Sequence, residues 1–177
     1  MTTVVGIDHA LGRTGIAIIR DDHDPDLRAV TSTGKSTDTH SARARRMISM
    51  RNQIMREIPR DADLIVIEGL SFGHNQPGQD RIHHLWWLIV TACDRIGLPL
   101  ASIPPTTMKK WATDNGQAKK PDVLAAISGM WPGVRLPNND LADALGCATA
   151  GAQHLGMPVR YLVQERHTLA LSKLVWP

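Results

Sequence analysis

Four carboxylates stand at positions where their type and spacing could support metal-dependent chemistry. Asp8 ends the apolar run VVGID, and Glu68 ends a second apolar run, LIVIE. Asp140 and Asp143 are three residues apart in a helical pattern, so they share one face of that helix. Gathered carboxylates repel one another, and hard divalent cations such as Mg²⁺ or Mn²⁺ remove that conflict. Two such ions can clamp the attacking and leaving oxygens of a phosphodiester, so the set predicts an acidic two-metal site.

Each acid also has an ordinary structural interpretation. Asp140 follows two asparagines and could cap a helix, and Asp143 lies in a first turn where the helix dipole favours an acid. Glu68 could simply face water at the end of its strand. Asp8 is harder to explain in this way, because aspartate is depleted in strands and this one ends an apolar run. The four together favour a site over coincidence.

The elements that would position these acids form an α/β pattern. Residues 3–9, 13–20 and 27–33 predict an antiparallel meander, and 61–70 and 99–105 predict two further strands. Helical periodicity or helix-start signals cover 40–58, 81–97, 106–114, 121–130 and 136–156, and a final helix is expected over about 160–177. The order predicts a mixed sheet, a three-strand antiparallel meander plus parallel strands, flanked by helices. In it, the strands that end at Asp8 and Glu68 would be neighbours.

The composition fits one globular domain over residues 1–177. Hydrophobic residues make up 42% of the chain and charged residues 21%. Cys93 and Cys147 lie in apolar surroundings without the spacing of a disulfide scaffold, which indicates a reducing compartment. The sequence contains neither a membrane-spanning apolar stretch nor the pattern of a signal peptide, so we expect a cytoplasmic protein.

Basic residues are unevenly placed, although the net charge is only +3. Such clusters suit phosphate backbones, but charge alone favours the plainer interpretation of solvated helix faces. The two clusters comprise Arg43, Arg45, Arg46, Arg51, Arg56 and Arg60, and Lys109, Lys110, Lys119 and Lys120.

These motifs, taken in order, resemble the RuvC-type Holliday junction resolvases of the ribonuclease H-like superfamily. GIDHALGRTGIAII is similar to the first-strand motif of that family, LIVIEGL to its second acidic strand, and DLADALGCATAG to its closing D-x-x-D-A-L helix. The segment IPPTTMKKWATDNGQAKKPDVLAAI resembles the proline- and lysine-bearing stretch ahead of a helix. The resemblance covers residues 3 to about 155, and the divergent loop after Glu68 resembles bacteriophage versions, which would act in the host cytoplasm.

The resemblance implies a ribonuclease H-like endonuclease that resolves four-way DNA junctions by paired symmetric cuts, leaving 5′-phosphate and 3′-hydroxyl ends. It implies a homodimer, for which the apolar stripe of the helix over 81–97 is the candidate interface. Phe72 would be the aromatic that probes the junction centre, although it follows Glu68 later than is usual in the family and could instead pack on the loop base. Two Mg²⁺ or Mn²⁺ ions would be held by the catalytic residues Asp8, Glu68, Asp140 and Asp143, and DNA phosphates would be bound by Lys109 or Lys110 and by Lys119 and Lys120.

Several histidines depart from the family pattern or stand outside it. His9 replaces a small residue or proline and could reach the metal site, but a neutral histidine in a turn is the plainer interpretation. His83 and His84 are adjacent on a helix and face different ways, so they suit core or dimer packing better than a ligand set.

Three other functions compete with junction resolution. A related nuclease could act on other branched DNA, on flaps or on an RNA precursor, and the sequence separates these substrates poorly. An actin-like ATP-binding fold shares a GID…TG pattern, but 177 residues leave no room for its duplicated domain. A junction-binding protein without catalysis would not need all four acids.

Overall fold

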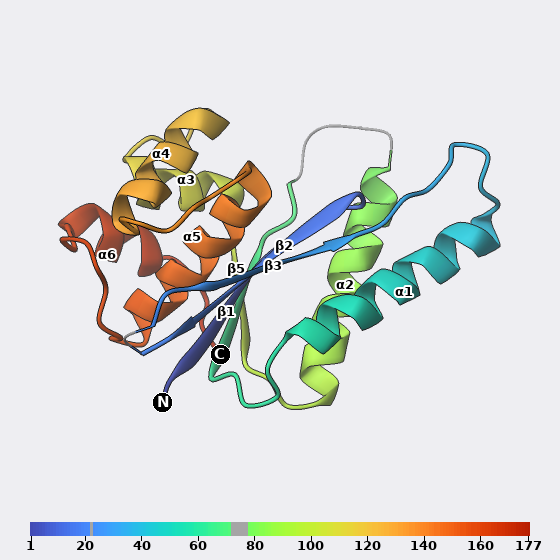
Figure 1. Cartoon of the computed structure of the whole chain (residues 1–177), viewed down its shortest axis with the longest axis horizontal. Coiled ribbons are helices and arrows are strands. Elements are labelled where there is room, and N and C mark those ends of the chain that lie inside the picture. Colours follow the sequence, from blue (N-terminus) through green and yellow to red (C-terminus); the bar gives the residue numbers. More distant parts are fainter. Residues whose placement is uncertain (22, 72–77) are drawn as a thin grey trace.

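The computed structural model describes residues 1–21, 23–71 and 78–177, in which five strands form one mixed sheet (Figure 1). The strands lie in the order β3-β2-β1-β4-β5. The pairs β1–β2 and β2–β3 are antiparallel, whereas β1–β4 and β4–β5 are parallel. This confirms the predicted mixed sheet. The strands are β1 (Thr3–Asp8), β2 (Arg13–Arg20), β3 (Asp26–Thr31), β4 (Leu64–Glu68) and β5 (Leu100–Ile103).

Helices cover both faces of the sheet. Figure 1 shows the sheet edge-on, with α1 and α2 on one side and α3 to α6 on the other. The predicted C-terminal helix over about 160–177 is much shorter in the structure, where α6 spans seven residues and the segments around it are irregular. The helices are α1 (His40–Glu57), α2 (Gln79–Arg95), α3 (Pro105–Thr113), α4 (Lys120–Met130), α5 (Asn139–His154) and α6 (Glu165–Leu171).

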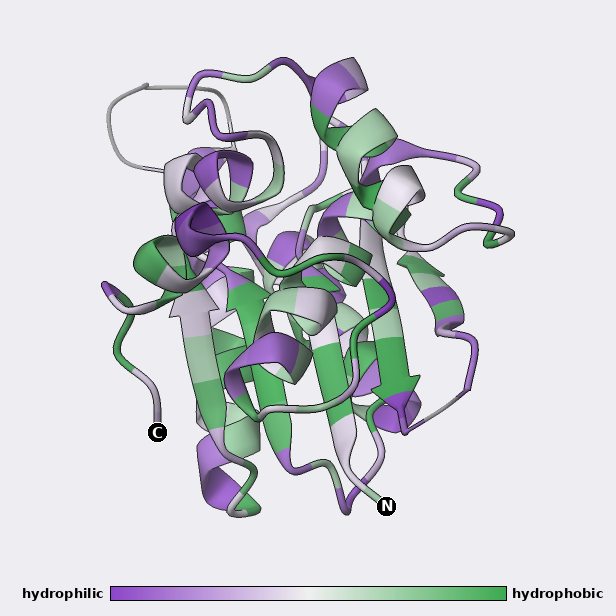
Figure 2. Ribbon diagram, turned by 90° about the vertical axis from the view of Figure 1, so that its left-hand side faces the viewer, coloured by the Kyte–Doolittle hydropathy of each residue, from purple (hydrophilic) through white to green (hydrophobic). Residues whose placement is uncertain are grey.

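Two hydrophobic clusters fill the space between the sheet and its two helical layers. Val4 and Val66 belong to the cluster beneath α5, and Ile7 and Ile67 belong to the cluster beneath α1 and α2. This alternation along the strands explains why β1 and β4 are apolar at almost every position, as Figure 2 shows by their hydrophobic colouring. Each fully buried aliphatic side chain contributes about 1.5–3 kcal/mol, so the two clusters hold the centre of the sheet firmly in place.

The apolar stripe of helix α2 packs into this core. Leu85 and Ile89 are fully buried against the sheet. The prediction that the stripe forms a dimer interface is therefore wrong, because its side chains are already covered. The outer surface of α2 instead carries Trp87, which is 58% exposed.

Helix α5 lies unusually close to β1 and β2 because glycines face it. A methyl group added at Gly6 would overlap the carbonyl oxygen of Ala144, and one added at Gly15 would overlap that of Asp140. The second contact presses the first turn of α5 onto the end of the β1–β2 hairpin. The two glycines therefore set the distance between the late helix and the strand that ends at Asp8.

Both cysteine thiols lie inside the protein. Cys93 and Cys147 are free and buried, and burial raises the pKa of Cys93 to about 11. A thiol with a raised pKa is a poor nucleophile at neutral pH. None of the helices in the described ranges combines the length and apolar composition needed to cross a membrane.

Candidate active site

Two of the predicted acids end neighbouring parallel strands. Ile7 of β1 pairs with Ile67 of β4, so the next residues, Asp8 and Glu68, emerge side by side at one edge of the sheet. The indole N–H of Trp86 donates to the carbonyl oxygen of Glu68 at 3.1 Å and fixes that strand end from α2. The predicted convergence of these two strand ends is thus present.

Asp8 and Glu68 share a hydrogen bond between their carboxyl groups. Burial is the main cause that raises the pKa of Asp8, from 3.8 to about 9, followed by the nearby charges of Glu68 and Asp143. Burial, and then Asp143, also raises the pKa of Glu68. At neutral pH, Asp8 therefore keeps its proton and donates a hydrogen bond to Glu68, because two buried carboxylates cannot both ionise without a compensating charge.

The other two acids lie near the start of α5, Asp140 in its first turn and Asp143 in the next, and they face different surroundings. Asn138 caps this helix through its side-chain oxygen, which accepts the Leu141 N–H at 3.0 Å, so neither acid is needed as a cap. Burial raises the pKa of Asp143, which is close enough to affect the pKa of both strand-end acids. Asp140 lies at the rim, where its carboxylate is 3.8 Å from Nε of Arg13.

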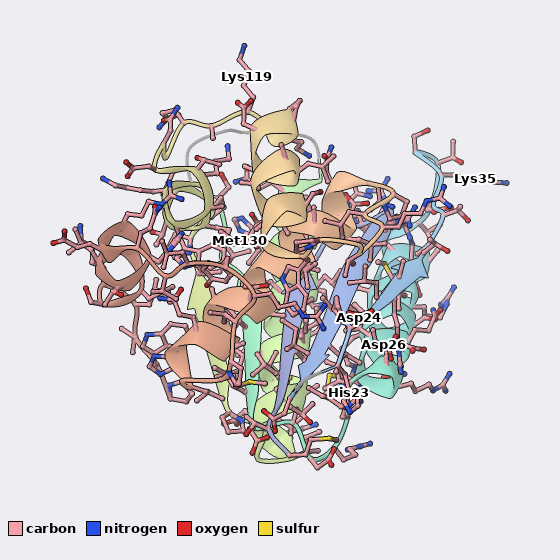
Figure 3. All side chains as sticks on the ribbon, turned by 60° about the vertical axis from the view of Figure 1, so that its left-hand side comes forward. His23, Asp24, Asp26, Lys35, Lys119 and Met130 are labelled. Atoms are coloured by element: carbon pink, nitrogen blue, oxygen red, sulfur yellow. The ribbon has the colours of Figure 1, made fainter. Side chains whose placement is uncertain are left out.

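Two of the four predicted lysines face the acids. Lys109 of α3 and Lys120 at the start of α4 lower the pKa of both Glu68 and Asp143, so their charges lie close to both carboxyl groups. Lys110 instead lines a groove between α3 and α6. Lys119 precedes α4, and Figure 3 shows its side chain projecting away from the body of the protein. Phe72 lies outside the described residues.

A pocket of about 200 Å³ adjoins Glu68 and brings two histidines to the site. His9 is 7% exposed, and burial, then His83, lowers its pKa to about 4. It is therefore neutral at physiological pH, and within the described part of the chain neither of its ring nitrogens has a hydrogen-bond partner. His83 lines the same pocket. The sequence analysis assigned this residue to core or dimer packing and did not predict its place beside Glu68. The sequence did contain a signal that places His83 near the site. The helix after β4 begins at the end of the sheet where Glu68 lies, and His83 is in the first turns of that helix.

The donor chemistry of the acids fits a hard divalent cation. Carboxylate oxygens are the ligands that Mg²⁺ and Mn²⁺ prefer, and a cation would supply the positive charge that the buried pair now obtains from a proton. Among the residues that the structure describes, no three His, Cys, Asp or Glu side chains already meet in a metal-holding arrangement. The side chains in direct contact are those of Asp8 and Glu68.

Arg46 of α1 contacts the backbone and the Ser32 side chain instead of the acids. Nε of Arg46 donates to the Ser32 hydroxyl at 2.7 Å, and its Nη2 donates to the carbonyl oxygens of Ser32 and Leu11. This side chain therefore ties α1 to the β1–β2 turn and to the chain after β3. At this position the basic run is structural.

Comparison with known proteins identifies a family for most of the chain. The family model described as crossover junction endodeoxyribonuclease RuvC matches residues 4–151. The crossover junction endodeoxyribonuclease RuvC of Acidiphilium cryptum is 28% identical over 158 residues, covering 89% of this chain and 94% of that protein. The protein of the same name from Zymomonas mobilis is 26% identical over 151 residues, covering 85% and 90%.

Solved structures show the same fold. A Thermus thermophilus RuvC structure matches with a TM-score of 0.64 at 19% identity, covering 88% of this chain and 98% of the other. Thermus thermophilus RuvC in complex with Holliday junction substrate matches with a TM-score of 0.65 at 16% identity, covering 88% and 97%. The family match ends at residue 151, before α6 begins.

Proposed function

The chain belongs to the RuvC family of crossover junction endodeoxyribonucleases, and we propose that it resolves four-way DNA junctions by paired symmetric cuts. The observation that carries this proposal is the buried pair of Asp8 and Glu68 at the ends of adjacent parallel strands, with Asp143 beside it. A purely architectural DNA-binding protein gains nothing from burying several acids together, since each costs free energy to desolvate. An enzyme that neutralises them with cations does gain.

Nucleases of this family depend on a metal ion, and we propose Mg²⁺ or Mn²⁺, two per site, held by Asp8, Glu68, Asp140 and Asp143. Bound there, the ions would lower the pKa of the attacking water and stabilise the leaving 3′ oxygen, giving 5′-phosphate and 3′-hydroxyl ends. The Asp8 carboxyl must first lose its proton, because a protonated carboxyl is a poor ligand. The raised pKa of Asp8 thus couples metal binding to proton release.

Basic side chains would hold the DNA while the acids act on it. Lys109 and Lys120 lie next to the carboxyl groups, so we assign them the phosphates that flank the cut. We assign Lys110 and Lys119 to phosphates further along the strand. Phe72 remains our candidate for the aromatic that enters the junction centre.

We propose that the enzyme works as a homodimer in the cytoplasm. A four-way junction is close to two-fold symmetric, and an isologous dimer places two active sites in matching positions. We place the interface on the outer surface of α2 around Trp87, which is 58% exposed, because aromatic side chains are enriched in protein interfaces. Trp86 supports this ring edge-on, with ring centroids 4.8 Å apart.

Cleavage of a synthetic four-way junction by the Asp8→Asn protein tests this function. The wild type should cut the junction in Mg²⁺ and prefer it to flap, duplex and RNA substrates, whereas Asp8→Asn should bind the junction and leave it intact. Asp61→Asn provides a matched control, because Asp61 is exposed and lies before β4, at the opposite end of that strand from Glu68. Cleavage by Asp8→Asn at the wild-type rate, or a preference of the wild type for another substrate, would contradict the proposal.

A further inference from the structure

A basic groove of about 330 Å³ lies between α3 and α6. Three cations from the two helices and from the chain after α6 line it: Lys110, Arg166 and Lys173. Asp114 is the one acid among its lining residues. We call this feature the α3–α6 groove.

The cations of this groove lack protein partners. Within the described residues, none of the three forms an ion pair, and the buried Nε of Arg166 has no hydrogen-bond partner. Elsewhere the chain does pair its arginines, for example Arg160 with Asp24 at 2.6 Å. An excess of unpaired positive charge in a groove attracts an anion, and a chain of phosphates satisfies several cations at once.

The groove adjoins the active site through α3. Pro105, the first residue of α3, lines the pocket beside Glu68, and the next two residues, Thr106 and Thr107, line the groove. Lys109 faces the acids while its neighbour Lys110 faces the groove. A nucleic acid strand that leaves the carboxyl pair would therefore cross α3 and enter the groove without a gap.

Helix α6 is held firmly enough to serve as one wall. The Trp111 indole N–H and the Tyr161 hydroxyl both donate to Oε1 of Gln153, at 3.0 and 2.8 Å. His167 of α6 is 1% exposed and packs against both rings, with centroids 5.6 Å from Trp111 and 5.2 Å from Tyr161. Because α6 is fixed before any ligand arrives, binding there costs little ordering entropy.

We propose that the α3–α6 groove binds the phosphate backbone of the junction arm that leaves the active site, through Lys110, Arg166 and Lys173. The inference rests on the proposed function, since it presupposes that the chain binds a junction. It adds a DNA-binding surface from α6, which lies beyond the family match over residues 4–151.

The test is the salt dependence of junction binding by the Arg166→Gln/Lys173→Gln protein, measured in EDTA with a fluorescent four-way junction. Removing two phosphate contacts should weaken binding about tenfold at low salt and make the slope of log K against log salt shallower by about 1.8, since each contact contributes about 0.9. Cutting in Mg²⁺ at saturating protein should keep its rate, because the groove holds the arm and not the reacting phosphate. The defect should disappear on junctions whose arms are trimmed too short to reach α6.

Three further proteins make the result decisive. Arg166→Lys/Lys173→Arg keeps both charges and should bind like the wild type. Arg60→Gln/Arg95→Gln removes two exposed cations from a groove near the ends of α1 and α2, and it should keep the wild-type slope. Lys173→Gln alone alters an exposed side chain and should show half the slope change, which provides a test if the double variant unfolds.

The outcomes separate the two proposals. A wild type that neither binds nor cuts a junction would overturn the proposed function and this inference with it. A wild type that binds and cuts, beside a folded Arg166→Gln/Lys173→Gln protein with unchanged affinity and slope, would overturn this inference alone. An equal loss in Arg60→Gln/Arg95→Gln would also overturn it, because bulk charge would then explain the effect.

Discussion

In the candidate active site, Asp8 and Glu68 tie the local charge to pH and, in our proposal, to metal binding. Asp8 has an ordinary pKa of 3.8 and a folded-state pKa of about 9, so between these values the folded protein binds a proton that the unfolded chain does not. Stability from this group therefore falls as pH rises through that window. The charges of three nearby acids raise the pKa of Asp8: Glu68, Asp143 and Asp140. Two lysines, Lys120 and Lys109, lower the pKa of Glu68 and of Asp143.

The first prediction concerns proton release on metal binding. Mg²⁺ must displace the Asp8 proton, so its apparent affinity should rise with pH between 6 and 9. Titration calorimetry at pH 7.5 in two buffers of different ionisation enthalpy should give different heats, which correspond to nearly one proton released per site. Asp8→Asn should show no such buffer dependence. Equal heats for the wild type in both buffers would contradict the prediction.

The second prediction concerns stability without metal. Asp8→Asn removes the buried acid but keeps its shape, so at pH 8 in EDTA it should raise the free energy of unfolding by on the order of a few kcal/mol. Urea denaturation measures the difference. The gain should shrink toward pH 4, where Asp8 is protonated in the folded protein at little cost, and it should shrink when Mg²⁺ is added to the wild type. A variant less stable than the wild type at pH 8 would be inconsistent with a strained carboxyl pair.

At the scale of the elements, the site depends on how closely α5 approaches the sheet. Gly15 of β2 lies against the carbonyl of Asp140, so the first turn of α5 leaves no room for a side chain at position 15. Asp140 lies in that turn, and Asp143 lies in the turn that follows it. The position of the late acids is therefore set by a glycine more than 120 residues earlier in the chain, near the strand that ends at Asp8.

The third prediction follows from this contact. Gly15→Ala should push the first turn of α5 outward, lower stability by about 1–3 kcal/mol and slow junction cutting at least tenfold, with junction binding in EDTA nearly unchanged. Gly129→Ala is the matched control, because nothing lies within 4 Å of the added methyl group. Thermal melting and single-turnover cleavage check both. Full activity in Gly15→Ala would mean that α5 can shift without moving its acids.

The fourth prediction concerns the arginine that ties α1 to the hairpin. Arg46→Met loses the hydrogen bonds to Ser32 and Leu11, so it should lower stability by about 2 kcal/mol. Arg45→Met alters an exposed arginine that donates to the Ser41 hydroxyl within the same helix, and it should change stability by less than about 0.5 kcal/mol. Urea denaturation compares the two. Equal effects would show that Arg46 acts only as a surface charge.

The elements also show what the sequence could and could not predict. Adjacent strand ends at Asp8 and Glu68 follow from strand order and parallel pairing, both of which are readable from apolar runs and crossover helices. The choice between Lys109 and Lys110 depends on the rotation of α3 about its axis, which packing against α6 and α4 decides. The tail forms a much shorter helix than the sequence predicts. Side chains at helical spacing become buried against the protein only over Glu165–Leu171, about two turns, where His167 and Ala170 are buried.

Across the whole molecule, the acids and two exposed arginines, Arg60 and Arg95, lie at opposite ends of the strands. Asp8 and Glu68 lie where β1 and β4 end, whereas Arg60 and Arg95 lie just before β4 and β5 begin. In our proposal, DNA that reaches the acids would meet Lys109 and Lys120, which come from helices on the α5 side. The opposite face carries α2 with its exposed Trp87, where we propose the dimer interface.

The fifth prediction is that Trp87 holds two copies together. If the indole is buried between protomers, the wild type should sediment at twice the 19.4 kDa mass of the chain, and Trp87→Ala should sediment as a monomer. Cruciform plasmid then reports the consequence for cutting: paired cuts give linear DNA, whereas uncoupled cuts give nicked circles first. Leu162→Ala removes an apolar side chain that is 81% exposed elsewhere, and it should remain a dimer. A dimeric Trp87→Ala that still produces linear DNA directly would place the interface on another surface, because a junction cut in one step requires two active sites held together.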